Sequence, residues 1–480
     1  MAAGLSLVIA SAGAQCATGQ AESAEVPDLR TMAFCIAHTS PPDGRAEIDP
    51  VRPYGLDELI DIAERSHPQT RIAWAQARQA AAQVGMERSA YYPHLAGMAL
   101  LGNQKLINPF PRPLAANGYT MVEMPIADAG LAVEYTILDF GRRGAHLDAA
   151  QNRQLAAAAH FERVHQDVAF SVVTAYSALV TAQQKLAAEK QILATAQATQ
   201  QAAEAQLAQG RATLPDVLNA RAGTAHAEFN LEASVGEEQT ARVRLREALG
   251  AEPSDAISIA PPPPKSAEEM AATISELLEA AQKDRPDLAA LASQLRAAGD
   301  DRKAAESAYR PTVEFAAKGA VQSIWPTVSV QDGSSLGDTT QFVWNVGLNI
   351  HWNFFDGGAR KSEVLARSAE ERAMREELRE RQDQVARATW TAWVQYRTAV
   401  RQQQAAKVLL DAATASYDAS REAYGYGVKN LIDLVNAEAQ LAEARLADVQ
   451  ARSAVFVSVA NLGYTTGTLL RGDAQKGAAQ

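Results

Sequence analysis

The chain has 480 residues, of which 47% are hydrophobic and 21% are charged, and its formal net charge is −11. This composition is typical of a folded protein and excludes a chain that is disordered throughout. The acidic balance, with no cluster of Lys and Arg, excludes a nucleic-acid-binding surface. Beyond the N-terminus no uncharged apolar run reaches the roughly 20 residues of a membrane-spanning helix, so any membrane-spanning part must consist of strands.

The N-terminal residues have the pattern of an export signal. Residues 1–14 carry an apolar stretch followed by small residues, which predicts a cleaved signal peptide. Such signals normally open with positive charge, whereas the first basic residue here is Arg30, so the true start of the signal stays open. Residues 15–55 are expected to form an extended segment. It contains both cysteines, Cys16 and Cys35; neither follows the small residue that lipidation favours, and a disulfide between them is left open.

A set of features in the first half of the chain recurs in the second half in the same order. Two prolines recur after 218 residues (286 − 68). An aspartate near glycine, and a motif of Gly, Asp and Asn, recur after 217 residues (427 − 210). The matching positions are Pro68 and Pro286, Pro93 and Pro311, Asp139 and Asp356, Gly210 and Gly427, Asp216 and Asp433, and Asn219 and Asn436. This order at a nearly constant offset predicts a tandem duplication.

Four consecutive prolines at 261–264 separate the copies, because proline cannot continue a helix and favours an extended spacer. The predicted organisation is a first repeat, a proline-rich linker, a second repeat and a C-terminal tail. Their expected ranges are 56–250, 251–269, 270–463 and 464–480.

Each copy contains a stretch with the composition of one very long helix. Residues 142–209 have no proline and are rich in Ala, Gln, Glu and Leu, and residues 359 to about 424 repeat this pattern. At about 1.5 Å per residue each helix would be on the order of 100 Å long, far more than a globular core requires. Apolar residues recur every seven positions at Val172, Leu179, Leu186 and Leu193. This heptad seam predicts coiled packing against another helix.

Period-two alternation predicts two strands per copy, four in the chain. The clearest runs from Gln341 to Phe354, where an apolar, aromatic face opposes a polar one, and the others follow Pro93, Asp128 and Pro311. Such strands are typical of transmembrane barrels. Four strands cannot close a barrel, and an open sheet edge leaves backbone groups unpaired in lipid, so several chains must build one wall.

Connections within each copy are also predicted. The proline-containing residues 103–124 and the residues 323–340 are expected to be hairpin loops. Asp139 and Asp356, each just before glycine and a long helix, are expected to be N-caps.

Long helices, two strands per copy, the duplication and the Phe355–Gly358 junction together resemble the TolC family of outer-membrane efflux proteins. The match covers about Leu56 to Gly463, and its most specific piece, Tyr424–Asn436, is similar to the second helix-hairpin tip of that family. The resemblance implies a membrane α+β fold: a homotrimer whose twelve strands form one β-barrel in outer-membrane lipid, continuous with a periplasmic α-helical barrel. It implies a passive duct, with no enzymatic activity, that docks onto a periplasmic adaptor and an inner-membrane pump.

The resemblance also assigns residues to a gate. The two positions that ring the aperture are Asp433 and Asn436. The three latch positions are Tyr424, Lys429 and Asp216, and the two tip glycines are Gly210 and Gly427. The chain departs from the commoner pattern because Asn436 is uncharged and Lys429 stands where arginine is usual. Lysine lacks the bidentate fork of arginine, so a weaker latch is expected.

Simpler roles account for several of these residues. Thr213 with Asp216, and Asn430 with Asp433, match capping-box variants at helix starts, and each tip glycine fits a helix C-cap. The capping and gate roles are compatible.

The remaining motifs predict no cofactor and no metal, because His160 and His165 are five residues apart and do not stack on one helix face. The alternative function is a periplasmic adaptor or coiled-coil scaffold without a pore. Two matched copies with aromatic strands argue against it. The sequence does not specify an exported substrate.

Overall fold

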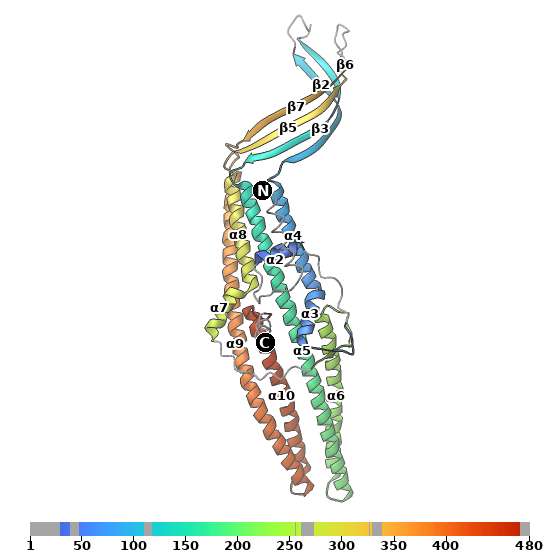
Figure 1. Cartoon of the computed structure of the whole chain (residues 1–480). Coiled ribbons are helices and arrows are strands. Elements are labelled where there is room, and N and C mark those ends of the chain that lie inside the picture. The colour runs from blue at the N-terminus through green and yellow to red at the C-terminus, as the bar shows by residue number, and fades with distance from the viewer. Residues whose placement is uncertain are drawn as a thin grey trace, which may run out of the picture. The chain divides into compact units, whose positions relative to one another are not determined.

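The computed structural model contains helices and strands over most of the chain (Figure 1). The described residues are 29–38, 48–109, 118–254, 256–260, 273–325, 327–328 and 338–470. The predicted signal peptide, Cys16 and the four prolines at 261–264 lie outside them. Cys35, on α2 (Leu29–His38), is disulfide-bonded.

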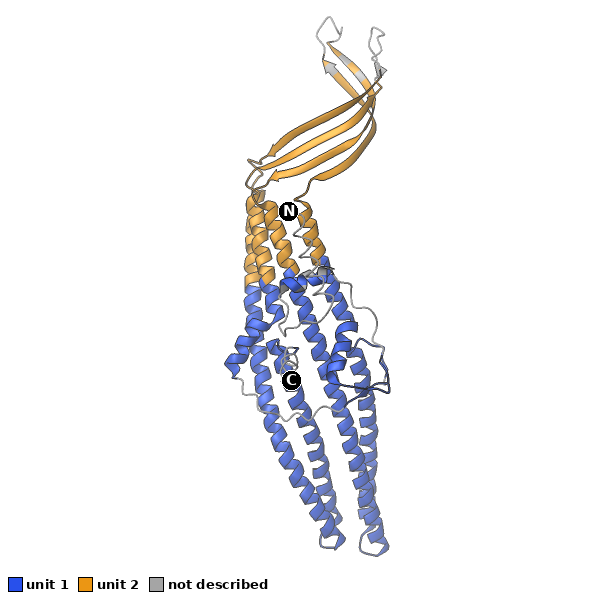
Figure 2. Cartoon of the chain, in the orientation of Figure 1, with its two compact units in different colours: residues 1–79, 155–292, 376–480 blue, residues 80–154, 293–375 orange. Residues whose placement is uncertain are grey.

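The chain divides into two compact units, and the division does not follow the repeats (Figure 2). The strand unit comprises residues 80–154 and 293–375, and the hairpin unit comprises residues 1–79, 155–292 and 376–480. Each unit therefore contains segments from both copies.

The strand unit contains four long strands in one antiparallel sheet with the order β2-β3-β5-β7. A two-residue strand, β6, pairs with β3 beside them. The bounds are β2 His94–Pro109, β3 Tyr119–Leu138, β5 Thr312–Ile324, β6 Thr327–Val328 and β7 Thr339–His351. The prediction of two long strands per copy is confirmed.

The predicted strand ends are wrong at several places. Residues 103–109 and 119–124 were expected in a loop, yet they pair from Asn103↔Pro125 out to Pro109↔Tyr119. Apolar alternation stops here, but backbone pairing continues because the ladder does not require apolar side chains. Residues 323–324 and 339–340 extend β5 and β7 in the same way. Conversely, Trp352 and Phe354 lie beyond the end of β7.

The two faces of the sheet differ in shape and chemistry. On β7 the apolar residues are 56–72% exposed along one face, at Phe342, Trp344, Val346, Leu348 and Ile350. On the opposite face β3 and β5 approach closely at Gly130, where an added Cβ would lie 2.3 Å from the Gly319 carbonyl oxygen. On this face Lys318 Nζ lies 3.1 Å from an oxygen of the buried Asp128 carboxylate. The apolar face therefore suits lipid, and the opposite face carries charge.

The same junction joins strand to helix in both copies. α5 (Arg142–Ala208) and α9 (Ala359–Gly425) each begin just after an aspartate whose carboxylate accepts the backbone N–H of the arginine four residues later. The arginine side chain also donates to that carboxylate. These pairs are Asp139 with Arg143 and Asp356 with Arg360. The predicted capping role of both aspartates is confirmed.

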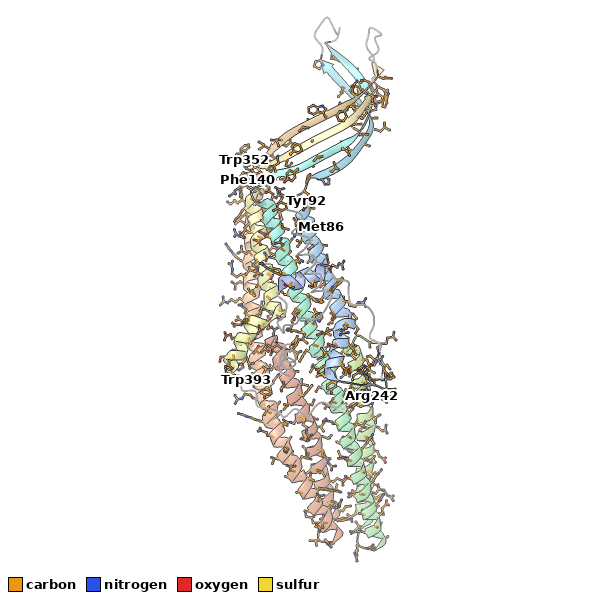
Figure 3. All side chains as sticks on the ribbon, in the orientation of Figure 1. Met86, Tyr92, Phe140, Arg242, Trp352 and Trp393 are labelled. Carbon is orange, nitrogen blue, oxygen red and sulfur yellow. The ribbon has the colours of Figure 1, made fainter. Side chains whose placement is uncertain are left out.

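Each junction arginine also contacts the residues just after the helix that precedes the strands. Those helices are α4 (Pro68–Ser89) and α8 (Pro286–Ser307). Arg143 donates to the Ala90 carbonyl (3.1 Å) and Arg360 to the Ala308 carbonyl (3.4 Å). Each guanidinium lies 5.1 Å from the ring centroid of the tyrosine that follows, Tyr91 or Tyr309. Phe140, between β3 and α5, and Trp352, between β7 and α9, lie where the strands meet the helices (Figure 3). The arginines therefore tie helix end to helix start.

The hairpin unit consists of two long helical hairpins and shorter elements. The hairpins are α5 with α6 (Leu214–Ala248) and α9 with α10 (Leu431–Thr466). The shorter elements are α2, α3 (Leu56–Ser66), α7 (Ile274–Asp284) and the parallel pair β1 (Pro53–Tyr54) and β4 (Ser258–Ile259). α10 extends past the expected repeat end at 463. Over the described residues, no helix is both long and apolar enough to cross a membrane.

The heptad prediction holds only for the first part of α5. Val172 and Leu179 are fully buried in one apolar cluster that also contains Leu245 of α6. Farther along, Leu186 and Leu193 are only half-buried. The buried seven-residue series there is Ala182, Glu189, Ala196 and Ala203. The predicted leucine seam is therefore wrong beyond Leu179, because small side chains allow closer helix contact on the neighbouring stripe.

We predict that Asp139→Ala destabilises the protein by about 1 kcal/mol, because a helix cap is lost. Burial alone would raise the pKa of the Asp139 carboxyl, but hydrogen bonds from Arg143 hold this pKa below its usual value. The stabilisation is therefore present above about pH 4 and lost as pH falls through the lowered pKa. Thermal unfolding followed by circular dichroism in detergent measures it. Asp148→Ala, at an exposed carboxylate of α5, is the control; an equal effect would contradict the capping role.

Candidate gate at the hairpin tips

Both hairpins turn through a glycine in the left-handed region. Gly210 has φ of 70° and Gly427 has φ of 75°. The Gly210 N–H donates to the Leu207 carbonyl at 2.9 Å, and the Gly427 N–H donates to the Tyr424 carbonyl at 3.0 Å. A residue with a side chain would be strained there, so glycine allows each long helix to end and the chain to reverse.

The first tip uses its aspartate for capping. Thr213 is the N-cap of α6, and one carboxylate oxygen of Asp216 accepts from the Thr213 N–H (2.8 Å) and hydroxyl (2.6 Å). These two hydrogen bonds, that of the hydroxyl first, hold the pKa of Asp216 below its usual value. The charge of Asp216 is therefore bound within its own tip.

The second tip is capped differently, although its spacing is the same. Asn430 is the N-cap of α10, and its side-chain oxygen accepts the backbone N–H of Asp433 at 2.8 Å. Within the described parts of the chain, the Asp433 carboxylate makes no hydrogen bond or ion pair. Asn436 is also exposed, three residues farther on and thus on the same helical face. The second tip therefore presents an uncommitted carboxylate.

The three latch candidates are not joined within one chain. Tyr424 is 6% exposed in an apolar cluster with Val217 and Leu431, and its hydroxyl has no partner among the described residues. Burial first, and then the charge of Asp216, raises the pKa of Tyr424. Lys429, in the turn between α9 and α10, donates instead to the Ser420 hydroxyl near the end of α9 at 3.1 Å. The charge of Asp216 therefore acts on Tyr424, whereas the side chain of Lys429 binds Ser420.

Two polar contacts between the hairpins were not predicted. Thr199 on α5 donates to the Glu438 carboxylate on α10 at 2.9 Å, and Gln206 donates to the Tyr424 carbonyl at 3.4 Å. Burial raises the pKa of Glu438. Neither contact has a local sequence signal, because each partner is a common helix residue more than 200 positions away in the chain.

A sheet with one apolar face and charge on the other, together with two very long helical hairpins, defines the class of an outer-membrane channel subunit. The chain belongs to the outer membrane efflux protein family, whose model matches residues 59–251 and 277–468.

Individual relatives extend over most of the chain. It is 27% identical over 427 residues to Protein CyaE of Bordetella pertussis, covering 88% of this chain and 86% of that protein. It is 25% identical over 386 residues to the outer membrane efflux protein BepC of Brucella suis, covering 80% and 79%. The fold matches that of the outer membrane protein VceC of Vibrio cholerae with a TM-score of 0.72 and 20% identity, covering 86% and 96%.

These findings confirm the predicted family, fold class and location in the outer membrane and periplasm. The protein is a non-enzymatic outer-membrane efflux channel.

We predict that the two tip aspartates respond differently to truncation. Asp216→Ala removes the acceptor of the Thr213 N–H and speeds hydrogen exchange of that amide. Asp433→Ala leaves the residue-433 amide protected, because its acceptor is Asn430. In the wild type, protection of the Thr213 amide is present above about pH 4 and falls as pH drops through the lowered pKa of Asp216. Hydrogen exchange with mass spectrometry measures both tips; equal responses would refute the distinction.

Proposed function

We propose that three copies of this chain form a passive export duct whose hairpin tips dock onto a periplasmic adaptor and an inner-membrane pump, with Asp433 lining the gate. The pump supplies the energy, and the duct carries the substrate outward. The observation that carries the gate proposal is the uncommitted Asp433 carboxylate beside a capping Asn430.

The edges of the sheet support assembly by strand pairing. β2 and β7 are the ends of the described four-strand path, and each has one long side without a partner strand there. Unpaired backbone groups cost several kcal/mol each in lipid. Pairing β7 of one subunit with β2 of the next subunit gives the backbone groups at both edges their hydrogen-bond partners.

Exposed apolar side chains support a docking role for the tips. Leu214 and Leu218 are 59% and 53% exposed on α6, and Tyr426, Val428 and Ile432 are 78%, 79% and 59% exposed at the second tip. Such side chains on an aqueous surface mark a protein contact when they gather together. An adaptor with apolar hairpin ends fits this surface.

Electrostatics supports a gate at Asp433. Three copies of one carboxylate around a narrow opening bind cations and repel anions, as rings of Asp and Glu do in cation channels. Asn436 adds hydrogen-bonding groups without charge on the same face. The tip that caps itself with an amide leaves its carboxylate available for this ring.

We expect the purified protein to be a trimer that conducts ions in a planar bilayer. Mass measurement in detergent and single-channel recording test this together. Cell fractionation separates the duct from the alternative, a periplasmic adaptor or scaffold without a pore. A monomer that is found in the periplasmic fraction and lacks pore activity would contradict the proposal.

Replacing Asp433 with Ala should raise the conductance by a factor of about two and weaken block by divalent cations, because one charge per subunit leaves a narrow ring. Single-channel recordings with and without Mg²⁺ measure both effects. Glu443→Ala is the matched control, since Glu443 is an exposed carboxylate farther along α10. Unchanged conductance and block in Asp433→Ala would remove Asp433 from the gate.

A further inference from the structure

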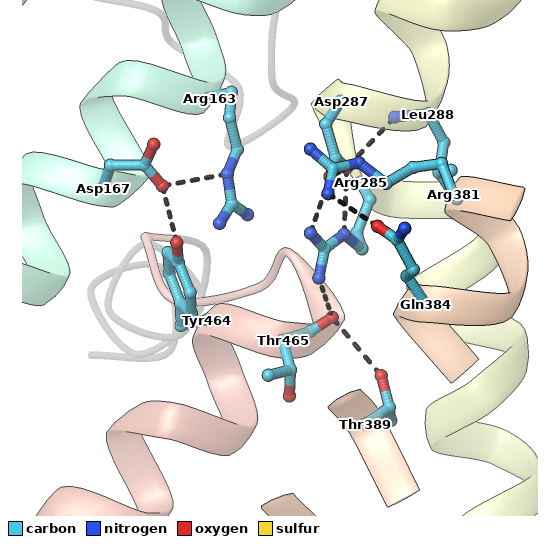
Figure 4. A network of polar contacts seen from close by, with 10 residues as sticks. All are labelled: Arg163, Asp167, Arg285, Asp287, Leu288, Arg381, Gln384, Thr389, Tyr464 and Thr465. Carbon is cyan, nitrogen blue, oxygen red and sulfur yellow. Dashed lines mark hydrogen bonds and ion pairs between the residues drawn. The ribbon is translucent and has the colours of Figure 1, made fainter. Parts of the chain in front are cut away.

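The end of α10 opposite its tip is held by a buried charged pair. Arg285 lies just before α8 and is 7% exposed, and two of its nitrogens donate to the two carboxylate oxygens of Asp287 at 2.9 and 2.7 Å. A third nitrogen donates to the Thr465 carbonyl in the last turn of α10 at 2.9 Å (Figure 4). The pair therefore binds a carbonyl that has no partner within the helix.

Neighbouring helices hold the same end of α10. Gln166 of α5 donates to the Gly467 carbonyl at 3.1 Å, and Tyr464 donates its hydroxyl to Asp167 at 2.8 Å. Gly467 has φ of 78°, and an added Cβ would lie 2.9 Å from the Asp284 carbonyl oxygen. The last turn of α10 is therefore fixed from α5, from the turn before α8 and through its own backbone.

Asp287 is the carboxylate on which three arginines converge. Arg285 binds it directly, Arg381 of α9 places Nε 3.5 Å from it, and the charge of Arg163 acts on it from α5. Burial would raise the pKa of Asp287, but Arg285 and the other arginines keep this pKa below its usual value. The carboxylate is therefore ionised at neutral pH. Loss of its charge would leave a buried arginine without compensation.

The matching turn of the first copy binds the end of its hairpin through a hydroxyl rather than through an ion pair. Gly250 sits over Ser66 and His67 as Gly467 sits over Asp284 and Arg285. There the Ser66 hydroxyl donates to the Leu249 carbonyl at 2.9 Å. The surrounding cluster is apolar, and its fully buried members include Leu59, Leu245 and Leu249. The two copies thus keep the same backbone arrangement but hold α6 with an apolar core and α10 with ions.

The length of α10 makes this anchor matter at the tip. Asp433 precedes Thr465 by 32 residues, so the two are separated by about 48 Å of helix at 1.5 Å per residue. A tilt of about 3° at the anchor displaces Asp433 by roughly 2.5 Å over that length. Small changes in how the last turn is held therefore move the carboxylate by a distance comparable to a hydrogen bond.

We propose that Arg285 and Asp287 are positioning residues that set the tilt of α10 and so hold the Asp433 ring in its narrow arrangement. The inference rests on the proposed gate at the second tip. The pair acts together with the hydrogen bonds of Gln166, Tyr464 and Thr389 at the same end of α10, and its buried charge makes it the contact whose loss should shift the helix most.

The test compares Asp287→Asn with Asp287→Glu, which keeps the charge, and with Ser66→Ala, which loosens the matching anchor of the first hairpin. Single-channel recording of the trimer measures the closed-state conductance. A nitroxide amino acid incorporated at Val428, which is 79% exposed, reports distances among the three second tips by pulsed electron paramagnetic resonance.

Asp287→Asn should raise the closed-state conductance about twofold or more and lengthen the label distances by several ångströms, about the displacement expected for a tilt of a few degrees. Asp287→Glu should restore both values toward those of the wild type, and Ser66→Ala should change neither. Unchanged distances in Asp287→Asn, or equal changes in Ser66→Ala, would overturn the proposal.

If Asp287→Asn does not assemble, Arg381→Gln provides the milder perturbation, since Arg381 is 46% exposed and lies at the rim of the network. It should shift both readouts in the same direction, and the absence of a shift would count against the anchor. A failure of the proposed gate is distinguishable from a failure of the anchor. If the gate proposal is wrong, Asp433→Ala leaves the conductance unchanged, and the label distances still show whether the anchor sets the tilt of α10.

Discussion

The constraint on which the protein depends is that backbone N–H and C=O groups in lipid must be hydrogen-bonded. The four long strands satisfy this requirement inside the sheet, whereas the outer edges of β2 and β7 have no partner strand among the described residues. Neither duplication nor longer strands removes the two edges; only closure does. A trimer of a duplicated chain is one solution. Each repeat contributes two strands and each chain therefore four, and threefold symmetry supplies the pairings between chains.

Duplication also explains why the two halves share some contacts and differ in others. The strand–helix junctions are matched almost atom for atom, with Asp139 and Asp356 capping the long helices and binding Arg143 and Arg360. The tips and anchors have diverged. Thr213 draws the carboxylate of Asp216 into the first tip, whereas Asn430 frees that of Asp433. The contacts that join strand to helix are thus common to both copies, and the differences between the copies lie at the hairpin tips and anchors.

Much of this architecture was predictable because it depends on local composition. A proline-free stretch rich in Ala, Gln, Glu and Leu forms a helix in almost any context, and both 67-residue helices begin at the predicted residue. The strand ends were not predictable in the same way. Residues 103–109 pair through their backbone after apolar alternation has stopped. The seam beyond Leu179 was missed because the buried stripe of a helix depends on which neighbour it meets.

The site was harder to predict than the fold. Asp216 and Asp433 have the same spacing to their caps, and only the chemistry of the capping side chain separates them. A hydroxyl can donate to the carboxylate, whereas the amide oxygen of Asn430 takes the backbone N–H and leaves the carboxylate unbound. The pair Arg285 and Asp287 carries no motif, since its role arises from a carbonyl 180 residues away.

The most direct test of this account is a cryo-electron microscopy structure of the purified protein in a lipid nanodisc. The account predicts a threefold-symmetric trimer in which β7 of each subunit pairs with β2 of the next subunit and Asp433 lines the narrowest part of the duct. A monomer, a sheet that closes by another pairing, or Asp433 facing away from the axis would contradict it.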